Sequence, residues 1–323
     1  MASAFAGIAV AGSVLVDKIN TIAAYPQSGQ LTQIQSIHRA VGGCVPNVAL
    51  DLKKICPQLD VQAVGTIGDD GDGDFVTEIL QSGGVDTTHL TRIPAQTSFT
   101  DVMSVHGGQR TFFTYAGASG EFGLQHIPFG EISPKILHLG YFLLLQKVDD
   151  GDGLKILQKA KELGWETSID LVSENSDRYP VVRPCLKYTD YLIINEFEAG
   201  KLADMEPTTE NLRAISEKLM EMGVQKMVII HMPDRSVCLS KNGYFCLGSH
   251  ILPQGFIQGT TGAGDAFCAG ALLGIYRGWD EEKILSFASC AAVRALSQAD
   301  ATSGLATEEE TWKFCEGFDR RQV

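Results

Sequence analysis

Short apolar runs alternate with helix-forming segments along most of the chain. The runs consist mainly of Val, Ile, Leu and Ala, and they occupy residues 6–11, 61–66, 135–140, 167–171, 191–194 and 226–231. The segments between them have apolar side chains at helical spacing, which is the pattern of βαβ units. This alternation predicts an α/β fold with a doubly wound, mostly parallel sheet that carries helices on both faces. Such sheets bind ligands at the carboxyl ends of their strands.

Residues 97–115 break this alternation. The segment is rich in Thr, Val and Phe, alternates polar with apolar residues, and has a Gly-Gly pair in its middle. It therefore predicts a β-hairpin, which we place outside the main sheet together with residues 33–38. No composition break divides the chain. We therefore expect a single domain over residues 1–323, with a small β-sheet lid, from about 13–40 and 96–117, inserted in the α/β core.

Several helices can be placed from their caps and spacing. One is expected over residues 47–55, where apolar side chains are available for packing. Another should begin at a cap on Thr208 or Thr209 and lead to Met222. Three more are expected near the C-terminus: the helix that carries Asp265, residues 281–296 and residues 307–318.

The overall composition restricts the partners. The chain has 39 acidic and 26 basic residues and a net charge of −13, which argues against a general affinity for nucleic acid or anionic membranes. No apolar run is long enough to span a membrane. The eight cysteines form no C-x-x-C pair, as is typical of free thiols in a reducing compartment. No basic residue precedes Lys18 in the apolar N-terminal stretch, which disfavours a signal peptide, and we expect a cytoplasmic location.

The sequence G-T-T-G-A-G-D, at residues 259–265, carries the clearest chemistry. It precedes a run of small and apolar residues and predicts a loop that opens a helix. The amides of a first helical turn, here those of Gly262, Ala263 and Gly264, have no partner within the helix and bind phosphates or oxyanions. The carboxylate of Asp265 beside them is placed to accept a proton from an attacking hydroxyl. A glycine turn before a helix is also common without any function, so the functional interpretation depends on motifs elsewhere in the chain.

Three motifs together point to one family. They are G-G-C-V-P-N at residues 42–47, N-E-F-E at residues 195–198 and T-T-G-A-G-D at residues 260–265. Their order and spacing resemble the ribokinase-like carbohydrate kinases, also called the PfkB family, from about residue 7 to residue 301. The resemblance implies the ribokinase-like α/β fold and the ATP-dependent phosphorylation of a hydroxyl on a small sugar or polyol.

The resemblance also assigns roles to the late motif. Asp265 would be the general base that deprotonates the acceptor hydroxyl. The backbone of Gly262, Ala263 and Gly264 would form the anion hole for the transferring phosphoryl group. Thr261 and Gly264 would contact the nucleotide.

The middle motif is expected to organise Mg²⁺. In the family that the chain resembles, Asn195 and Glu198 act through water near the nucleotide phosphates, a mode that suits the strong hydration of this ion. Asp170, at the end of a predicted strand facing the same crevice, is a further candidate for that water network. The alternative interpretation of Asn195 and Glu198 is a strand end followed by a capped helix.

The acceptor sugar is expected on the early motif. Asp17, Gly42, Gly43 and Asn47 match positions that grip sugar hydroxyls in the family that the chain resembles. Carboxylate and amide groups can form paired hydrogen bonds with vicinal hydroxyls, and glycines let a sugar lie against the backbone. Each residue also has an ordinary interpretation, with Asp17 as a surface charge, Asn47 as a helix cap and the glycines as a turn.

The chain also departs from the family pattern. Gly259 stands where many members have an acidic residue that helps to bind a monovalent cation, which counts against potassium activation. Leu15 stands where ribose kinases tend to have an asparagine, which counts against ribose as the substrate. Residues 231–236 lack the usual glycine-rich turn, so we expect a remodelled nucleotide edge.

Other functions stay open. A nucleoside kinase of the same fold and a non-catalytic sugar-binding relative are the alternatives. A dinucleotide-dependent oxidoreductase is disfavoured because no G-x-G-x-x-G follows the first predicted strand. The lid leaves an exposed edge or face that proteins usually cover, and in the family the lid often forms a dimer contact. We therefore expect a homodimer formed through the lid.

Overall fold

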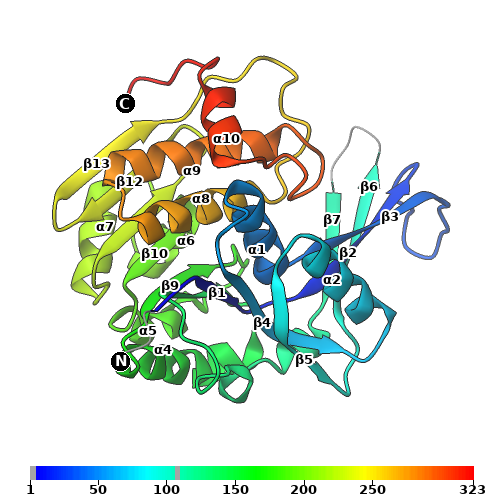
Figure 1. The fold of residues 1–323 in the computed structure, drawn as a ribbon. Helices are drawn as coiled ribbons and strands as arrows, with labels where there is room; N and C mark the ends of the chain where they lie inside the picture. The colour runs from blue at the N-terminus through cyan, green and yellow to red at the C-terminus, as the bar shows by residue number, and fades with distance from the viewer. Residues whose placement is uncertain (1–4, 106–109) are drawn as a thin grey trace.

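A twisted, mostly parallel sheet runs through the molecule (Figure 1). The computed structural model describes residues 5–105 and 110–323, and within them nine strands form this sheet. Strands β11, β12 and β13 pair antiparallel at one edge, and the other pairs are parallel. The spatial order is β13 (Gly243–Gly248), β12 (Arg235–Ser240), β11 (Met227–His231), β10 (Tyr191–Asn195), β9 (Glu166–Leu171), β8 (Ile136–Phe142), β1 (Ile8–Ala11), β4 (Val61–Gly68) and β5 (Asp86–Ile93).

The apolar strands of this sheet supply both halves of the core. Successive side chains of a strand point to opposite faces, and in β1 Ile8 and Val10 join one hydrophobic cluster while Ala9 and Ala11 join the other. A strand that is apolar at every position is therefore buried from both sides. The doubly wound architecture expected from the apolar runs is confirmed.

Helices cover the two faces separately (Figure 1). Residues of α1 (Cys44–Ile55), α2 (Gly71–Ser82), α8 (Ala263–Arg277), α9 (Glu281–Leu296) and α10 (Glu308–Cys315) pack on the Ile8 face. The Ala9 face carries α4 (Gly153–Glu162), α5 (Arg183–Leu186), α6 (Glu196–Ala203) and α7 (Leu212–Glu221). The short elements are α3 (Gly117–Gly120), η1 (Leu124–His126), η2 (Val148–Asp152) and η3 (Tyr179–Val182). No helix of the described segments is both long and apolar enough to cross a membrane.

A second, four-stranded sheet stands beside the first, with the order β3-β2-β6-β7 (Figure 1). Its strands are β2 (Leu15–Ile22), β3 (Ile34–Gly42), β6 (Ser98–Val105) and β7 (Arg110–Tyr115). The central pair, β2 and β6, is parallel and joins segments far apart in the sequence. This sheet confirms the predicted lid, although β3 extends further than expected. The predicted Gly-Gly turn of the hairpin falls within residues 106–109 and lies outside the described residues.

Two local features differ from the sequence-based expectation. Strand β5, at the edge of the main sheet, was not expected because Asp86–Ile93 is polar at most positions and only partly buried. Helix α7 begins at Leu212 after Asn211, so the predicted cap on Thr208 or Thr209 is wrong. The backbone N–H of Ile215 bonds instead to the carbonyl of Asn211.

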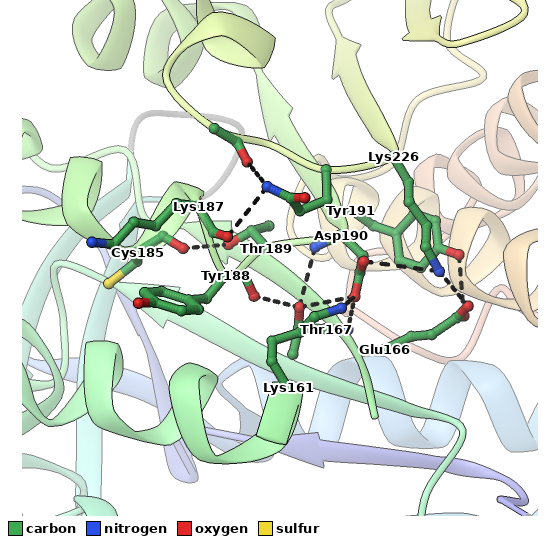
Figure 2. A network of polar contacts seen from close by, with 12 residues as sticks. Lys161, Glu166, Thr167, Cys185, Lys187, Tyr188, Thr189, Asp190, Tyr191 and Lys226 are labelled. Carbon is green, nitrogen blue, oxygen red and sulfur yellow. Dashed lines mark hydrogen bonds and ion pairs between the residues drawn. The ribbon is translucent and has the colours of Figure 1, made fainter. Parts of the chain in front are cut away.

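A polar network joins the strand starts opposite the site described below (Figure 2). The buried carboxylate of Asp190, just before β10, accepts hydrogen bonds from the backbone N–H of Thr167 at 2.9 Å and from the ammonium of Lys161. Lys226, just before β11, pairs with Glu166 at the start of β9. A buried carboxylate needs such partners, and here they lock three neighbouring strands. The starts of these strands therefore have a structural role. The carboxyl ends of the strands, on the opposite side of the sheet, are where such sheets bind ligands.

Candidate active site

The carboxyl ends of β8, β9 and β10 open into a cavity of about 250 Å³ at the start of α8. The strand order reverses at β1, between β8 and β4, which is where open α/β sheets form a crevice. The cavity brings together the predicted site residues Asp170, Asn195, Glu198, Gly262, Gly264 and Asp265.

The entry into α8 has the geometry of an anion site. Gly262 is the N-cap at φ 78°, a left-handed conformation that favours glycine. A side chain there would also collide with Ala301, whose Cα would lie 2.5 Å from the added Cβ. Glycine at the N-cap supplies no side-chain cap, and Gly264 is exposed. The N–H of Ala263 makes a long contact of 3.4 Å with the carbonyl of Thr260. The start of α8 thus offers backbone N–H groups and the positive end of the helix dipole to a negatively charged group.

Asp265 lies in the first turn of α8, 7% exposed. Its carboxylate accepts a 2.9 Å hydrogen bond from Nδ2 of Asn47. The phenol of Tyr141 donates to the two carboxylate oxygens at 3.0 Å each. Burial, followed by the charge of Asp170, raises the pKa of Asp265 to about 7. A carboxyl that titrates near neutral pH is suited to general base catalysis.

Tyr141 is a site residue that our sequence interpretation missed. It lies near the end of β8 at φ 61°, where a non-glycine residue is uncommon. Its backbone N–H donates to Oδ1 of Asp170 at 2.5 Å, while its phenol reaches Asp265. The sequence did contain a signal for Tyr141. This residue ends the segment L-H-L-G-Y, at the carboxyl end of a strand that neighbours the strand of Asp170.

The predicted sugar residues gather where the lid joins the main sheet. Gly42 lies against Asp17, since a Cβ on Gly42 would be 2.6 Å from Oδ2 of the aspartate. Gly43 is the N-cap of α1 at φ 88°, and Asn47 follows one turn later. Burial raises the pKa of Asp17 to about 6. The charge of Asp17 in turn contributes to the raised pKa of Asp265, so the two carboxyl groups lie near enough to interact electrostatically.

The N-x-x-E motif forms a capping box at the start of α6. Oδ1 of Asn195 accepts from the backbone N–H of Glu198 at 2.9 Å, and the carboxylate of Glu198 accepts from the backbone N–H of Asn195 at 3.1 Å. The capped helix that was the alternative interpretation is therefore present. Both side chains also line the cavity. Burial raises the pKa of Glu198 to about 8.

Asp170 has partners on two sides. Besides the Tyr141 amide, it lies 3.4 Å from Nε2 of the buried His138. Nδ1 of that imidazole lies 3.1 Å from Oγ of Ser168. These contacts fix the carboxylate at the end of β9, where it faces the cavity and raises the pKa of Asp265.

A larger groove of about 700 Å³ adjoins the cavity and shares Ser173, Asn195, His231 and Gly264 with it. Its apolar wall includes Leu252, Ile257, Phe267, Ala292, Val293 and Leu296. Thr260, Ala263 and Gly264 also line it, and Thr261 is absent from its lining. An apolar groove that ends at the N-terminus of a helix suits a flat ring joined to phosphates.

Comparison with known proteins identifies the family of the chain. The pfkB family of carbohydrate kinases matches residues 7–308. Ribokinase of Arabidopsis thaliana is 25% identical over 88% of this chain and 74% of the relative. The 5-dehydro-2-deoxygluconokinase of Shouchella clausii is 24% identical over 87% of each chain.

Solved structures share the fold. Ribokinase of Thermotoga maritima superposes with a TM-score of 0.81 at 23% identity and covers 97% of this chain and 100% of its own. Arabidopsis thaliana ribokinase complexed with ribose and ATP gives 0.80 at 22% identity, over 96% and 98% of the two chains. The ribokinase-like fold expected from the three motifs is confirmed, and the chain belongs to the pfkB family of carbohydrate kinases.

Proposed function

We propose that this kinase transfers the γ-phosphoryl group of ATP to a hydroxyl of a small sugar or polyol, with Asp265 as the general base. The observation that carries the proposal is the position of this carboxylate. It is buried at the amide-rich start of α8, in contact with Asn47 from the predicted sugar site. A base must lie within hydrogen-bond reach of the proton that it removes, and a hydroxyl bound beside Asn47 would be within that reach of Asp265.

In the proposed reaction the acceptor hydroxyl donates to Asp265 and attacks the γ-phosphorus in line. The O–P bond to the acceptor forms as the bond to ADP breaks, and the carboxylate takes the proton. The amides of Gly262, Ala263 and Gly264 stabilise the charge on the equatorial oxygens of the phosphoryl group. Their place in the first turn of α8 supports this role, and the long contact of the Ala263 N–H with the carbonyl of Thr260 would be exchanged for one with the phosphoryl group.

We propose that Glu198, Asn195 and Asp170 hold Mg²⁺ through water. The donor set fits this ion, since carboxylate and amide oxygens line one face of the cavity and hydrated Mg²⁺ needs few direct ligands. When bound, Mg²⁺ neutralises phosphate charge. The capping box holds Glu198 in place beforehand, and Thr261 and Gly264 are proposed to contact the nucleotide.

The acceptor is proposed to bind Asp17, Gly42, Gly43 and Asn47. The two curated relatives described above are named for ribose and for a deoxy sugar acid, which makes both compound classes the first to test. The buried Leu15 packs against Gly42 and offers no hydrogen bond to a hydroxyl. We therefore propose a sugar other than ribose, and with Gly259 in the loop we propose no requirement for a monovalent cation.

A coupled assay of ADP release tests the proposal. Hexoses, pentoses, sugar acids, inositols and nucleosides would each be supplied with Mg·ATP. Turnover of a sugar or polyol supports the proposal, and turnover restricted to nucleosides favours the nucleoside kinase. Binding of sugars without ADP release, measured by calorimetry, favours the non-catalytic relative.

We propose that two copies associate through their lids. The lid exposes large apolar side chains on its two edge strands, β3 and β7, with Ile37 70%, Phe112 57%, Phe113 58% and Tyr115 48% accessible. Unpaired edge strands with exposed apolar side chains are usually covered, and a second copy would cover one of them. Sedimentation velocity of the purified chain measures the association directly.

Three further properties are proposed for the whole chain. All eight cysteines are free, and seven of them are buried, which supports a reducing, cytoplasmic environment. The net charge of −13 supports small-molecule partners in place of nucleic acid or membranes. Both hydrophobic clusters pack on one sheet, which supports a single kinase domain with an inserted lid.

A further inference from the structure

Three buried oxygen atoms on helix α1 have no hydrogen-bond partner. They are Oδ1 of Asn47 and both carboxylate oxygens of Asp51. Among the described residues, the only other buried side-chain atom of this kind is Oδ1 of Asp234. Unpaired buried polar atoms are rare in folded proteins, so their concentration beneath the active site calls for a physical explanation.

The carboxyl group of Asp51 is in a setting that disfavours its charge. The side chain is 0% exposed and no N–H or O–H donates to it. Burial raises its pKa well above the ordinary value, and the charges of Asp265 and Asp300 add to this effect. Lys54 acts in the opposite direction, but its ammonium group is bound at 2.6 Å to the carbonyl of Thr302. A neutral carboxyl is the form that this environment favours.

A neutral carboxyl gains a donor. Protonated aspartate has one O–H group to give and keeps an acceptor oxygen. Asn47 and Asp51 are four residues apart in α1, so their side chains lie one above the other on the same helix face. The unpaired Oδ1 of Asn47 is therefore the acceptor that this helix spacing offers to the Asp51 hydroxyl.

We propose that Asp51 is a positioning residue whose protonated carboxyl donates a hydrogen bond to Oδ1 of Asn47 and so holds Nδ2 of Asn47 toward Asp265. An amide can turn over and exchange its oxygen and nitrogen. A donor on Oδ1 blocks that exchange, which would place the amide oxygen against the Asp265 carboxylate. One buried proton thus provides hydrogen-bond partners for two of the three unpaired oxygens. It also fixes the direction of donation, from Asp51 to Asn47 and from Asn47 to Asp265. The proposal rests on Asp265 being the base.

Two matched variants separate this role from packing. Asp51→Asn keeps the shape of the side chain and supplies an N–H donor, so we expect kcat within about threefold of wild type. Asp51→Leu keeps the branched shape of the side chain but removes the donor. We expect kcat to fall roughly 10- to 100-fold with no loss of thermal stability. Because the Asn47 hydrogen bond lowers the pKa of Asp265, Asp51→Leu should also move the acid limb of the kcat/KM profile upward by about one pH unit.

Infrared spectroscopy reads the proton itself, independently of turnover. A carboxylic C=O band present in wild type at pH 8 and absent from Asp51→Asn is expected. If that band is absent from wild type, or if Asp51→Asn loses as much activity as Asp51→Leu, the proposal is overturned. A requirement for potassium in wild type that Asp51→Leu abolishes would also overturn it, because the oxygens would then hold a cation. Full activity of Asp265→Asn with the band still present would instead reject the assigned base.

Discussion

The phenol of Tyr141 donates to the two carboxylate oxygens of Asp265, at 3.0 Å each. An acceptor hydroxyl that passes its proton to Asp265 needs one of those oxygens. The phenol keeps the carboxylate hydrogen-bonded, and a hydroxyl approaching the proposed base would have to share it with the phenol. In the proposed complex Tyr141 shares Asp265 with the substrate.

Replacing Tyr141 by Phe tests this relationship. The phenol lowers the pKa of Asp265 through its hydrogen bond, so we expect Tyr141→Phe to raise the pH midpoint of kcat/KM by up to about one unit. Activity well above that midpoint should stay within roughly threefold of wild type, because the carboxylate is ionised there. A pH profile identical to that of wild type would show that the contact does not affect the base.

Asp265→Asn should remove the base and keep the fold. The amide has nearly the same shape, so ATP binding measured by calorimetry is expected to persist. Turnover should fall by about 10²- to 10⁴-fold, the usual contribution of a general base. A variant with near-normal rates would require another residue to take the proton.

The rate of the wild-type enzyme should increase with pH through about 7. Burial raises the pKa of Asp265 to about 7, and the proposed base acts only when ionised. Below this pH the carboxyl is protonated and kcat/KM for the sugar should fall about tenfold per unit. A stopped assay at constant free Mg²⁺ between pH 5 and pH 9 measures this decrease in kcat/KM at low pH. If Asp265→Asn shows the same decrease, the decrease has another origin.

The same pKa predicts that Asp265→Asn stabilises the protein. The ordinary pKa of this carboxyl is 3.8, and burial raises it to about 7 in the folded state. Between these values the folded chain binds a proton that the unfolded chain releases, so wild-type stability falls as pH rises through this window and stays low above it. We expect the variant to gain roughly 2–4 kcal/mol in the free energy of unfolding at pH 8. Urea titrations at pH 8 and pH 5 should show the gain shrinking at the lower pH.

Glu198→Gln and Asn195→Ala should separate the proposed magnesium role from helix capping. Glutamine can still accept from the backbone N–H of Asn195, so Glu198→Gln should fold normally and require about 10- to 100-fold more Mg²⁺ for half-maximal rate. Asn195→Ala removes the cap of α6 and should also cost about 1 kcal/mol in stability. An unchanged Mg²⁺ dependence in both variants would leave the motif with capping alone.

The sequence predicted strands best where burial is complete. The runs that became β1, β10 and β11 are apolar at nearly every position and are covered from both sides. Strand β5 was not predicted because an edge strand needs few apolar residues, and its sequence, D-T-T-H-L-T-R-I, contains few. The predicted helix cap on Thr208 or Thr209 was wrong because several residues before α7 can begin the helix. Tertiary contacts decide which of them does so.

The site was predictable in its motifs and less so in its contacts. Glycines and Asp265 in one short segment identify the anion site because their chemistry is local. The hydrogen bond from Asn47 to Asp265 joins residues 218 positions apart, and the partners of Tyr141 lie on separate elements. Burial raises the pKa of Asp265 only after α1, α8 and β8 pack around it, so no single stretch of sequence contains that property.

The residues of the proposed acceptor site are divided between the two sheets. Asp17 belongs to strand β2 of the smaller sheet, whereas Asn47 and Asp265 belong to helices of the larger one. If the proposed site is correct, substitutions in β2 would change the alcohol that is recognised while α8 keeps the residues proposed for phosphoryl transfer. Specificity and chemistry would then reside in separate structural modules of one chain.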